Sequence, residues 1–182
     1  MHKLKSISAA AVPAALEKAL RYRLLNEPVE AESICLDILR VDPDNTEAQV
    51  TLLLARTDLF DEEYVAALER AKAVLPLLTS EYDRAYYEGM IYERWAKAQA
   101  HRKVPEHVVI GWHQHAMHCF ERAQALAPPD NPDAILRWNT CARRLDREAA
   151  PVAADPSMTR DVETEFGDET PSHLVTSSKN RA

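Results

Sequence analysis

One segment of the sequence concentrates side chains that could bind a metal ion. Residues 112–119 read Trp-His-Gln-His-Ala-Met-His-Cys, with His115 and Cys119 four positions apart. Residues four apart share one face of a helix, and imidazole and thiolate are ligands that zinc and copper favour. His115, His118 and Cys119 are therefore a candidate metal site, and titration of the histidines near neutral pH is an alternative use. Because the three side chains point away from Ala116, we expect them to face solvent.

Motifs that would support catalysis are missing from the sequence. It contains no Ser-His-Asp order, no HExxH and no GxSxG. With 3 glycines in the whole chain, the glycine-rich phosphate loops of most nucleotide-dependent enzymes are excluded as well. The acids at 61–63 are explained by the dipole of the helix they begin. The sequence thus predicts a non-catalytic protein without a cofactor.

Charge and cysteine content limit the partners and the compartment. The net charge is -7 and no stripe of Lys and Arg is present, so nucleic acid is not an expected partner. No run of 18 apolar residues occurs, so no membrane span is expected. Cys35, Cys119 and Cys141 are odd in number and unrelated in spacing. They predict free thiols in a reducing compartment, the cytoplasm.

The pattern of apolar residues predicts that helices position these groups. Apolar residues recur at helical spacing from residue 13 to about residue 145, and no segment alternates as a strand does. The fold class is therefore all-α, with Thr46 and Asp61 as expected caps of the third and fourth helices. The fifth and sixth helices form a long hairpin that places Trp95 near Trp112 and closes its far half with its own aromatic rings. The expected helices are 13–24, 29–41, 46–55, 61–75, 80–102, 105–127 and 133–147.

Composition divides the chain into three parts. Residues 12–149 carry the helical periodicity and form the expected domain, after a flexible lead-in at 1–11. Residues 150–182 hold an excess of acids, many Ser and Thr, and few apolar groups. Such a segment cannot offset the entropy of ordering, so we expect a disordered acidic tail. The tail either docks on a partner, covers the protein's own groove, or only solubilises the chain.

An internal repeat is visible in the helical region. Two segments share a small residue, an apolar residue seven positions later and a proline five positions after that. The small residue lets two antiparallel helices approach, the second fills the next layer, and the proline ends the helix. The two copies are Ala31, Ile38 and Pro43, and Ala116, Ala123 and Pro128.

This spacing resembles the tetratricopeptide repeat, and short arrays of that kind occur in many bacterial proteins. The second helix of the repeat carries Ala, Phe, Ala and Pro at the spacing of Ala116, Phe120, Ala123 and Pro128. In the first unit Cys35 replaces the aromatic residue. The resemblance implies a tetratricopeptide-like α-solenoid of about three helix pairs, with a long protruding hairpin of the fifth and sixth helices. A last helix with Ile135, Trp138 and Ala142 would be its C-terminal capping helix.

The resemblance also implies where a partner binds. Tetratricopeptide arrays line a concave groove with the first helix of each repeat, and here that face is expected to hold a peptide or amphipathic helix of another protein. Alternatively, its apolar residues pack against each other. The expected groove residues are Leu16, Leu20, Val50, Leu54, Tyr86, Met90 and Arg94, with Glu17, Arg23, Asp58 and Glu93 on the rims.

The expected function is thus a scaffold or adaptor for protein-protein interaction. One alternative is a structural self-association module, a homo-oligomer that pairs through Trp95, Trp112 and the surface around Trp138. A second alternative is a metal- or pH-responsive regulator that uses His115, His118 and Cys119.

Overall fold

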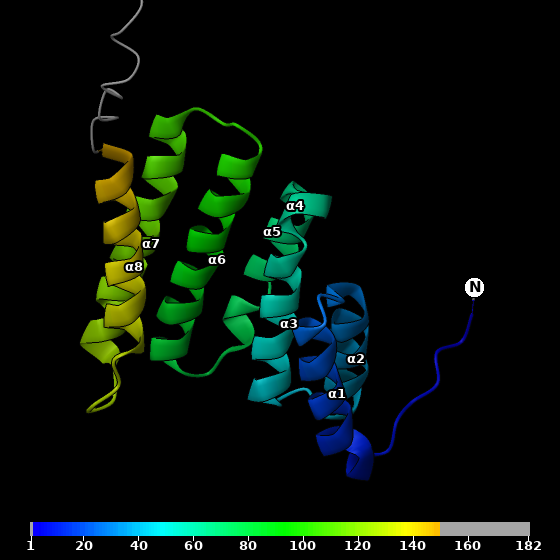
Figure 1. Ribbon diagram of the computed structural model, residues 1–182. Coiled ribbons are helices and arrows are strands. Elements are labelled where there is room, and N and C mark those ends of the chain that lie inside the picture. Colours follow the sequence, from blue (N-terminus) through cyan, green and yellow to red (C-terminus); the bar gives the residue numbers. More distant parts are fainter. Residues whose placement is uncertain (1, 150–182) are drawn as a thin grey trace, which may run out of the picture. The chain divides into compact units, whose positions relative to one another are not determined.

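The computed structural model describes residues 2–149, in which every regular element is a helix (Figure 1). The all-α prediction is confirmed for this part of the chain. The acidic tail expected at 150–182 lies outside the described residues. The elements are η1 (Ala9–Ala11), α1 (Val12–Leu24), α2 (Pro28–Val41), α3 (Thr46–Asp58), α4 (Phe60–Glu63), α5 (Val65–Lys72), η2 (Leu75–Leu77), α6 (Glu81–His101), α7 (Glu106–Leu126) and α8 (Asp133–Ala149), where η marks a 3-10 helix.

Local side chains set most of the helix limits. Pro13 and Pro28 occupy the first turns of α1 and α2, where a missing N–H costs nothing. The Asn45 side chain accepts a hydrogen bond from the Ala48 N–H at 2.9 Å and caps α3. The prediction of Thr46 as this cap is wrong by one residue, because the amide oxygen of Asn45 reaches the free N–H first.

The predicted helix 61–75 is broken into two. Tyr64 lies between α4 and α5 with a φ of 52°, a strained conformation for a bulky residue. Its ring packs against Trp95 at 5.0 Å between centroids, and the Arg102 guanidinium lies 4.3 Å from the ring centroid on another side. These contacts stabilise a backbone that the local sequence disfavours. Asp61 therefore lies within α4 instead of capping a longer helix.

The helices follow one another in space in the order of the chain (Figure 1). Each packs chiefly against its neighbours in sequence, and α3 also contacts α1 and α6. The largest hydrophobic cluster runs through α1, α2, α3, α5 and α6, and a second joins α6, α7 and α8. In the expected lead-in, Ile7 packs against the cluster around Val12 and Leu16. The core is thus a continuous series of helix-helix contacts.

Aromatic residues of a neighbouring helix close the far half of the α6–α7 hairpin. The Trp95 ring meets Phe60 edge-on at 5.4 Å and Tyr64 at 5.0 Å, both between centroids. Trp112 instead stacks on Tyr92 of α6 at 5.6 Å. The two tryptophans border the same cluster, as expected. For Trp95 the expectation that the hairpin closes itself without a neighbour is wrong, because Phe60 of α4 and Tyr64 just after α4 supply the covering rings.

A close contact fixes the separation of α6 and α7. Phe120 is fully buried, as are Ala116 and Ala123 on the same helix. A Cβ atom at Gly89 would lie 2.6 Å from Phe120 Cε1. Gly89 has no side chain, so the Phe120 ring can lie directly against the α6 backbone.

We expect Gly89→Ala to destabilise the fold although Ala favours helix. The substitution gains about 1 kcal/mol of helix propensity, but the added methyl would overlap a buried ring, and overpacking costs about 1–3 kcal/mol. The net free energy of unfolding, measured by urea denaturation, should fall by about 1 kcal/mol. The control is Gly111→Ala on α7, where nothing lies within 4 Å of the new Cβ and stability should rise. Equal stabilisation by both substitutions would contradict the close contact.

Candidate functional site

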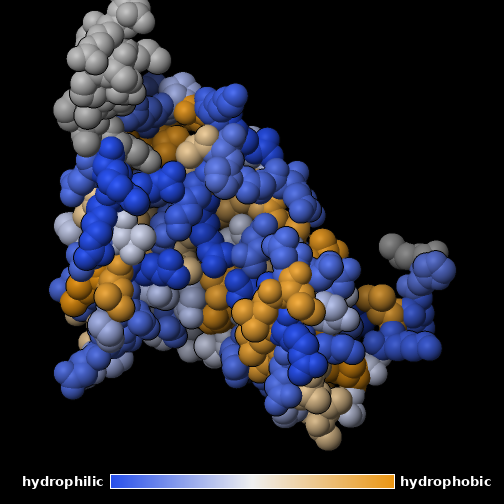
Figure 2. Space-filling view, in the orientation of Figure 1, coloured by the Kyte–Doolittle hydropathy of each residue, from blue (hydrophilic) through white to orange (hydrophobic). Residues whose placement is uncertain are grey.

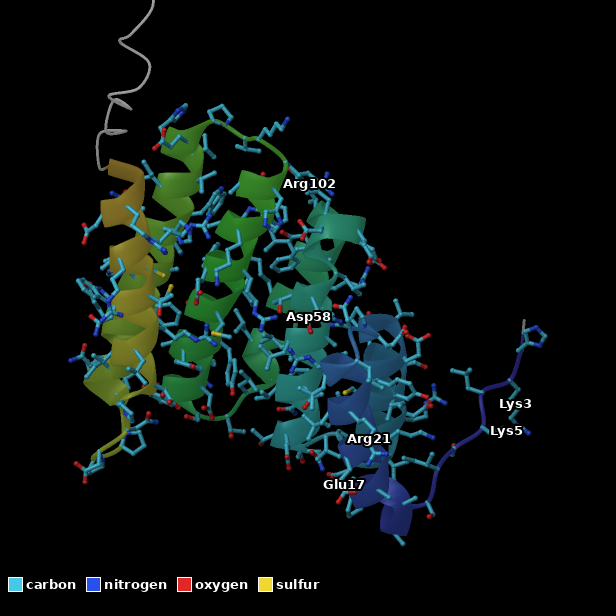
Figure 3. All side chains as sticks on the ribbon, in the orientation of Figure 1. Lys3, Lys5, Glu17, Arg21, Asp58 and Arg102 are labelled. Atoms are coloured by element: carbon cyan, nitrogen blue, oxygen red, sulfur yellow. The ribbon has the colours of Figure 1, made fainter. Side chains whose placement is uncertain are left out.

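Asp58 connects three helices through ion pairs. It is the last residue of α3, which lies between α1 and α6 (Figure 3). Arg23 of α1 donates from Nε to Asp58 Oδ2 at 2.9 Å, and Arg94 of α6 donates from a terminal nitrogen to Oδ1. Arg94 also donates to Thr57 Oγ1 at 2.9 Å. The carboxylate of Asp58 is therefore shared by two guanidinium groups from different helices.

Glu93 forms a second shared carboxylate. Its side chain is 1% exposed, and Lys97 Nζ lies 2.5 Å from Oε1 one turn further along α6. Arg137 of α8 approaches Oε2 at 3.5 Å. Burial lowers the pKa of Arg137, but the charge of Glu93 and a hydrogen bond to Tyr86 together raise it more, so this pKa lies above its usual value. Glu93 thus links α6 to α8.

The side chains that form these ion pairs leave an excess of positive charge on one surface, which we call the charged face. The cations Arg23, Arg94, Lys97 and Arg137 share the two carboxylates, so two positive charges exceed the negative ones. The four side chains are between 17% and 38% exposed, so solutes can reach them. This local excess favours contact with anionic groups, and the exposed carboxylate of Asp61, which lines the same surface, reduces it at one edge. The charged face consists of Arg23, Asp58, Glu93, Arg94, Lys97 and Arg137.

A shallow hollow of about 280 Å³ lies on the charged face. Its size is below the roughly 300–1,000 Å³ of small-molecule sites, and it suits one or two side chains of a peptide. At one edge His101 Nδ1 lies 3.2 Å from Asp61 Oδ2, and Arg102 donates to the Asp61 carbonyl at 2.7 Å. The lining residues are Thr57, Asp58, Phe60, Asp61, Arg94, Lys97, Ala98, His101 and Arg137.

The protein itself buries two of the residues expected to line an apolar groove and partly covers four more. The half-buried ones among them pack against the hydrophobic clusters of the core. Their placement agrees with the alternative that they pack against each other, and rim residues form the charged face instead. Sequence analysis missed Lys97, although its position four after Glu93 was a signal, and Arg137. Of the expected residues, Leu16 and Met90 are buried, Val50, Leu54, Tyr86 and Arg94 are half-buried, and Leu20 is exposed.

The candidate metal ligands are rearranged relative to the sequence prediction. The ligand atoms of Glu88, His115 and Cys119 all lie within 4.8 Å of one another. His118 is not part of this group; its Nδ1 lies 3.9 Å from Glu121 Oε2. The expectation that all three predicted ligands face solvent is wrong for Cys119, which is buried. Burial, followed by the charge of Glu88, raises the pKa of the Cys119 thiol to about 12.

Comparison of the chain with protein-family models, curated proteins and solved structures found no match. Among residues 2–149, no helix has both the length and the apolar character needed to cross a bilayer. Apolar residues cover part of α1, whereas hydrophilic residues dominate much of the visible surface of α8 (Figure 2).

We expect the two cations on Glu93 to stabilise the fold jointly. Lys97→Met or Arg137→Met alone leaves one cation beside the carboxylate and should cost less than about 1 kcal/mol. The double variant removes both cations from a buried carboxylate, and breaking such a pair costs about 3–5 kcal/mol. Urea denaturation of the two single variants and the double variant measures this coupling.

A third substitution controls for lost packing. Adding Glu93→Gln to the double variant removes the buried charge, so most of the lost stability should return. Additive costs of the two single variants, with no recovery in the triple variant, would contradict the role assigned to Glu93.

Proposed function

We propose that residues 12–149 form a tetratricopeptide-like α-solenoid. Its helix pairs would be α1 with α2, α3 with α5, and α6 with α7, and α8 would be the capping helix. Support comes from the buried positions of Ala116, Phe120 and Ala123 on α7. The contact of Phe120 with Gly89 is the kind of close approach between two helices that this repeat spacing allows.

We further propose that the protein is a non-catalytic scaffold that binds an acidic, extended peptide segment of a partner protein on the charged face. The observation that carries the proposal is the sharing of two carboxylates by four partly exposed cations. An apolar helix is a poorer fit, because Leu16 and Met90 are buried and most of the other apolar side chains expected to hold it are half-buried against the core clusters. An acidic peptide instead offers carboxylates to the excess cations.

Binding of this kind leaves the internal ion pairs in place. Arg94 and Arg137 each have several N–H donors, so each can retain its internal carboxylate while another N–H bonds to a partner carboxylate. The hollow between them would hold the side chain that separates two such acids. Because the cations are partly exposed, each contact contributes little by itself. Affinity should therefore depend on several acids in register and fall as salt concentration rises.

The test removes the excess charge without unpairing either carboxylate. In Arg94→Gln/Arg137→Gln, Asp58 keeps Arg23 and Glu93 keeps Lys97. A displayed random peptide library, selected on the wild-type full chain, should yield peptides rich in Asp and Glu. By fluorescence anisotropy, the double variant should bind a recovered peptide at least about tenfold more weakly, which corresponds to about 1.4 kcal/mol.

The control variant loses the same net charge elsewhere. Lys18→Gln/Arg40→Gln removes two exposed cations outside the charged face and should bind within about twofold of wild type. Circular dichroism melts check that all proteins are folded. Enrichment of apolar peptides, or equal loss of binding in both double variants, would refute binding of an acidic peptide on the charged face.

Self-association is a second candidate function, on a different surface from the one expected. Trp95 is buried, and Trp112 and Trp138 are half-buried against the hydrophobic clusters, so the most exposed apolar side chain lies elsewhere. An exposed apolar patch covers α1 and its junction with α2 (Figure 2), and its most exposed member, Leu24, is 88% exposed. Patches of this kind mark interaction sites, and a second copy could cover it. The exposed apolar residues of α1, of the turn after it and of α2 include Leu20, Leu24, Leu25, Val29 and Leu36.

This candidate predicts a concentration-dependent dimer. Sedimentation velocity of wild type should show a dimer fraction that grows with concentration, and Leu24→Glu/Val29→Glu should remove it by placing charge in an apolar contact. The control Leu126→Glu/Leu136→Glu changes two exposed leucines elsewhere and should leave the dimer unchanged. A monomer at all concentrations would exclude self-association through this patch.

A further inference from the structure

The close contact between α6 and α7 brings three potential metal ligands together. Gly89 lies directly against Phe120, and the residues immediately before them, Glu88 and Cys119, meet across the same contact. His115 precedes Cys119 by one helical turn and joins them. From this convergence we propose that Glu88, His115 and Cys119 bind a zinc ion.

The distances between the donors suit a tetrahedral ion after a small adjustment. The ligand atoms lie within 4.8 Å of one another. Zinc binds these ligand types at roughly 2.0–2.3 Å, which places any two of them about 3.3–3.8 Å apart in a tetrahedron. The carboxyl group of Glu88 ends a side chain with three rotatable bonds, so it can close the remaining distance by about 1 Å without backbone movement. The two ligands on α7 are held by the helix itself.

Neighbouring side chains orient two of the ligands. The Tyr92 ring meets the His115 imidazole edge-on at 4.1 Å between centroids and stacks on Trp112 on another side. Arg122 donates to Glu88 Oε2 at 3.3 Å, so the other carboxylate oxygen can face the ion. Partners that hold a ligand in this way raise the affinity of metal sites. The imidazole and the carboxylate are thus partly positioned before the ion binds.

The site is closed on one side and open on the other. Cys119 is 1% exposed, whereas His115 lies on the surface. Three protein ligands with one open position form the arrangement of zinc sites that keep a water molecule. In the metal-free protein the thiol is hydrogen-bonded to Glu88. Binding of zinc replaces the thiol proton, which is released to solvent.

This site is separate from the charged face. Glu88 and Glu93 are five positions apart on α6, so they point in directions about 140° apart around the helix. Zinc binding therefore goes beyond the proposed binding of an acidic peptide, and neither proposal depends on the other.

The experiment uses the untagged full-length chain after treatment with a chelator. Isothermal titration with zinc chloride should show one ion bound per chain. Cobalt chloride should produce a thiolate-to-cobalt charge-transfer band in the near ultraviolet, which reports direct binding to sulfur. Absence of saturable zinc binding, or a stoichiometric cobalt complex without this band, would overturn the proposal and leave Glu88 and Cys119 as a structural hydrogen bond.

Single substitutions identify the ligands. His115→Ala and Glu88→Gln should each weaken zinc binding by at least about tenfold. Removing a residue that only supports a ligand already lowers metal affinity by about 10–100-fold. Cys119→Ser should abolish the cobalt band. Because Cys119 is buried and its variant could misfold, the exposed His115 carries the decisive test.

Matched controls come from the same residue types. His118→Ala removes an exposed histidine of α7 outside the group, and Cys141→Ser removes another buried thiol. Both should bind zinc within about twofold of wild type. A loss in His118→Ala as large as in His115→Ala would refute the proposed ligand set.

Discussion

The contact between Gly89 and the Phe120 ring is the constraint on which much of the structure depends. It lets α6 and α7 approach more closely than two helices with ordinary side chains would, and each of these helices has 21 residues. Because interiors are closely packed, this contact sets the separation and register of the two helices around it. It aligns Glu88 with Cys119 on one side and leaves Glu93 to meet α8 on another.

Stability alone does not account for the charged face. Half-buried ion pairs return little net stability, because desolvation offsets most of their attraction, and apolar residues of similar volume often do as well or better. A surface needed only to join α1, α3, α6 and α8 could therefore be apolar. Shared carboxylates instead keep four cations partly exposed and fixed in position. Fixed cations lose less entropy on binding an anion, which suits the proposed peptide.

The local sequence was sufficient to predict the fold class and most helix limits. It was insufficient where contacts with residues far along the chain determine the conformation. Helical periodicity, Pro28 in the first turn of α2 and Ser80, whose hydroxyl caps α6, act within a few residues, so their effects were predictable. The break at Tyr64 was not, because Trp95 and Arg102 far along the chain stabilise it. The sequence predicted a group of candidate metal ligands on one helix, whereas in the structure Glu88 of α6 takes the place of His118 beside His115 and Cys119. Spacing within a helix contains no information about the helix that packs across it.

The α6–α7 hairpin can carry both the charged face and the proposed zinc site without coupling them. Transmission between sites needs an element with two arrangements whose equilibrium both ligands shift. The α6–α7 contact offers no second arrangement nearby, because Phe120 is fully buried and lies against backbone at Gly89. Any sliding of the helices would drive a neighbouring α6 side chain into the ring. Zinc at Glu88 would therefore stabilise the hairpin without altering the charged face, and the free energies of the two binding events should add.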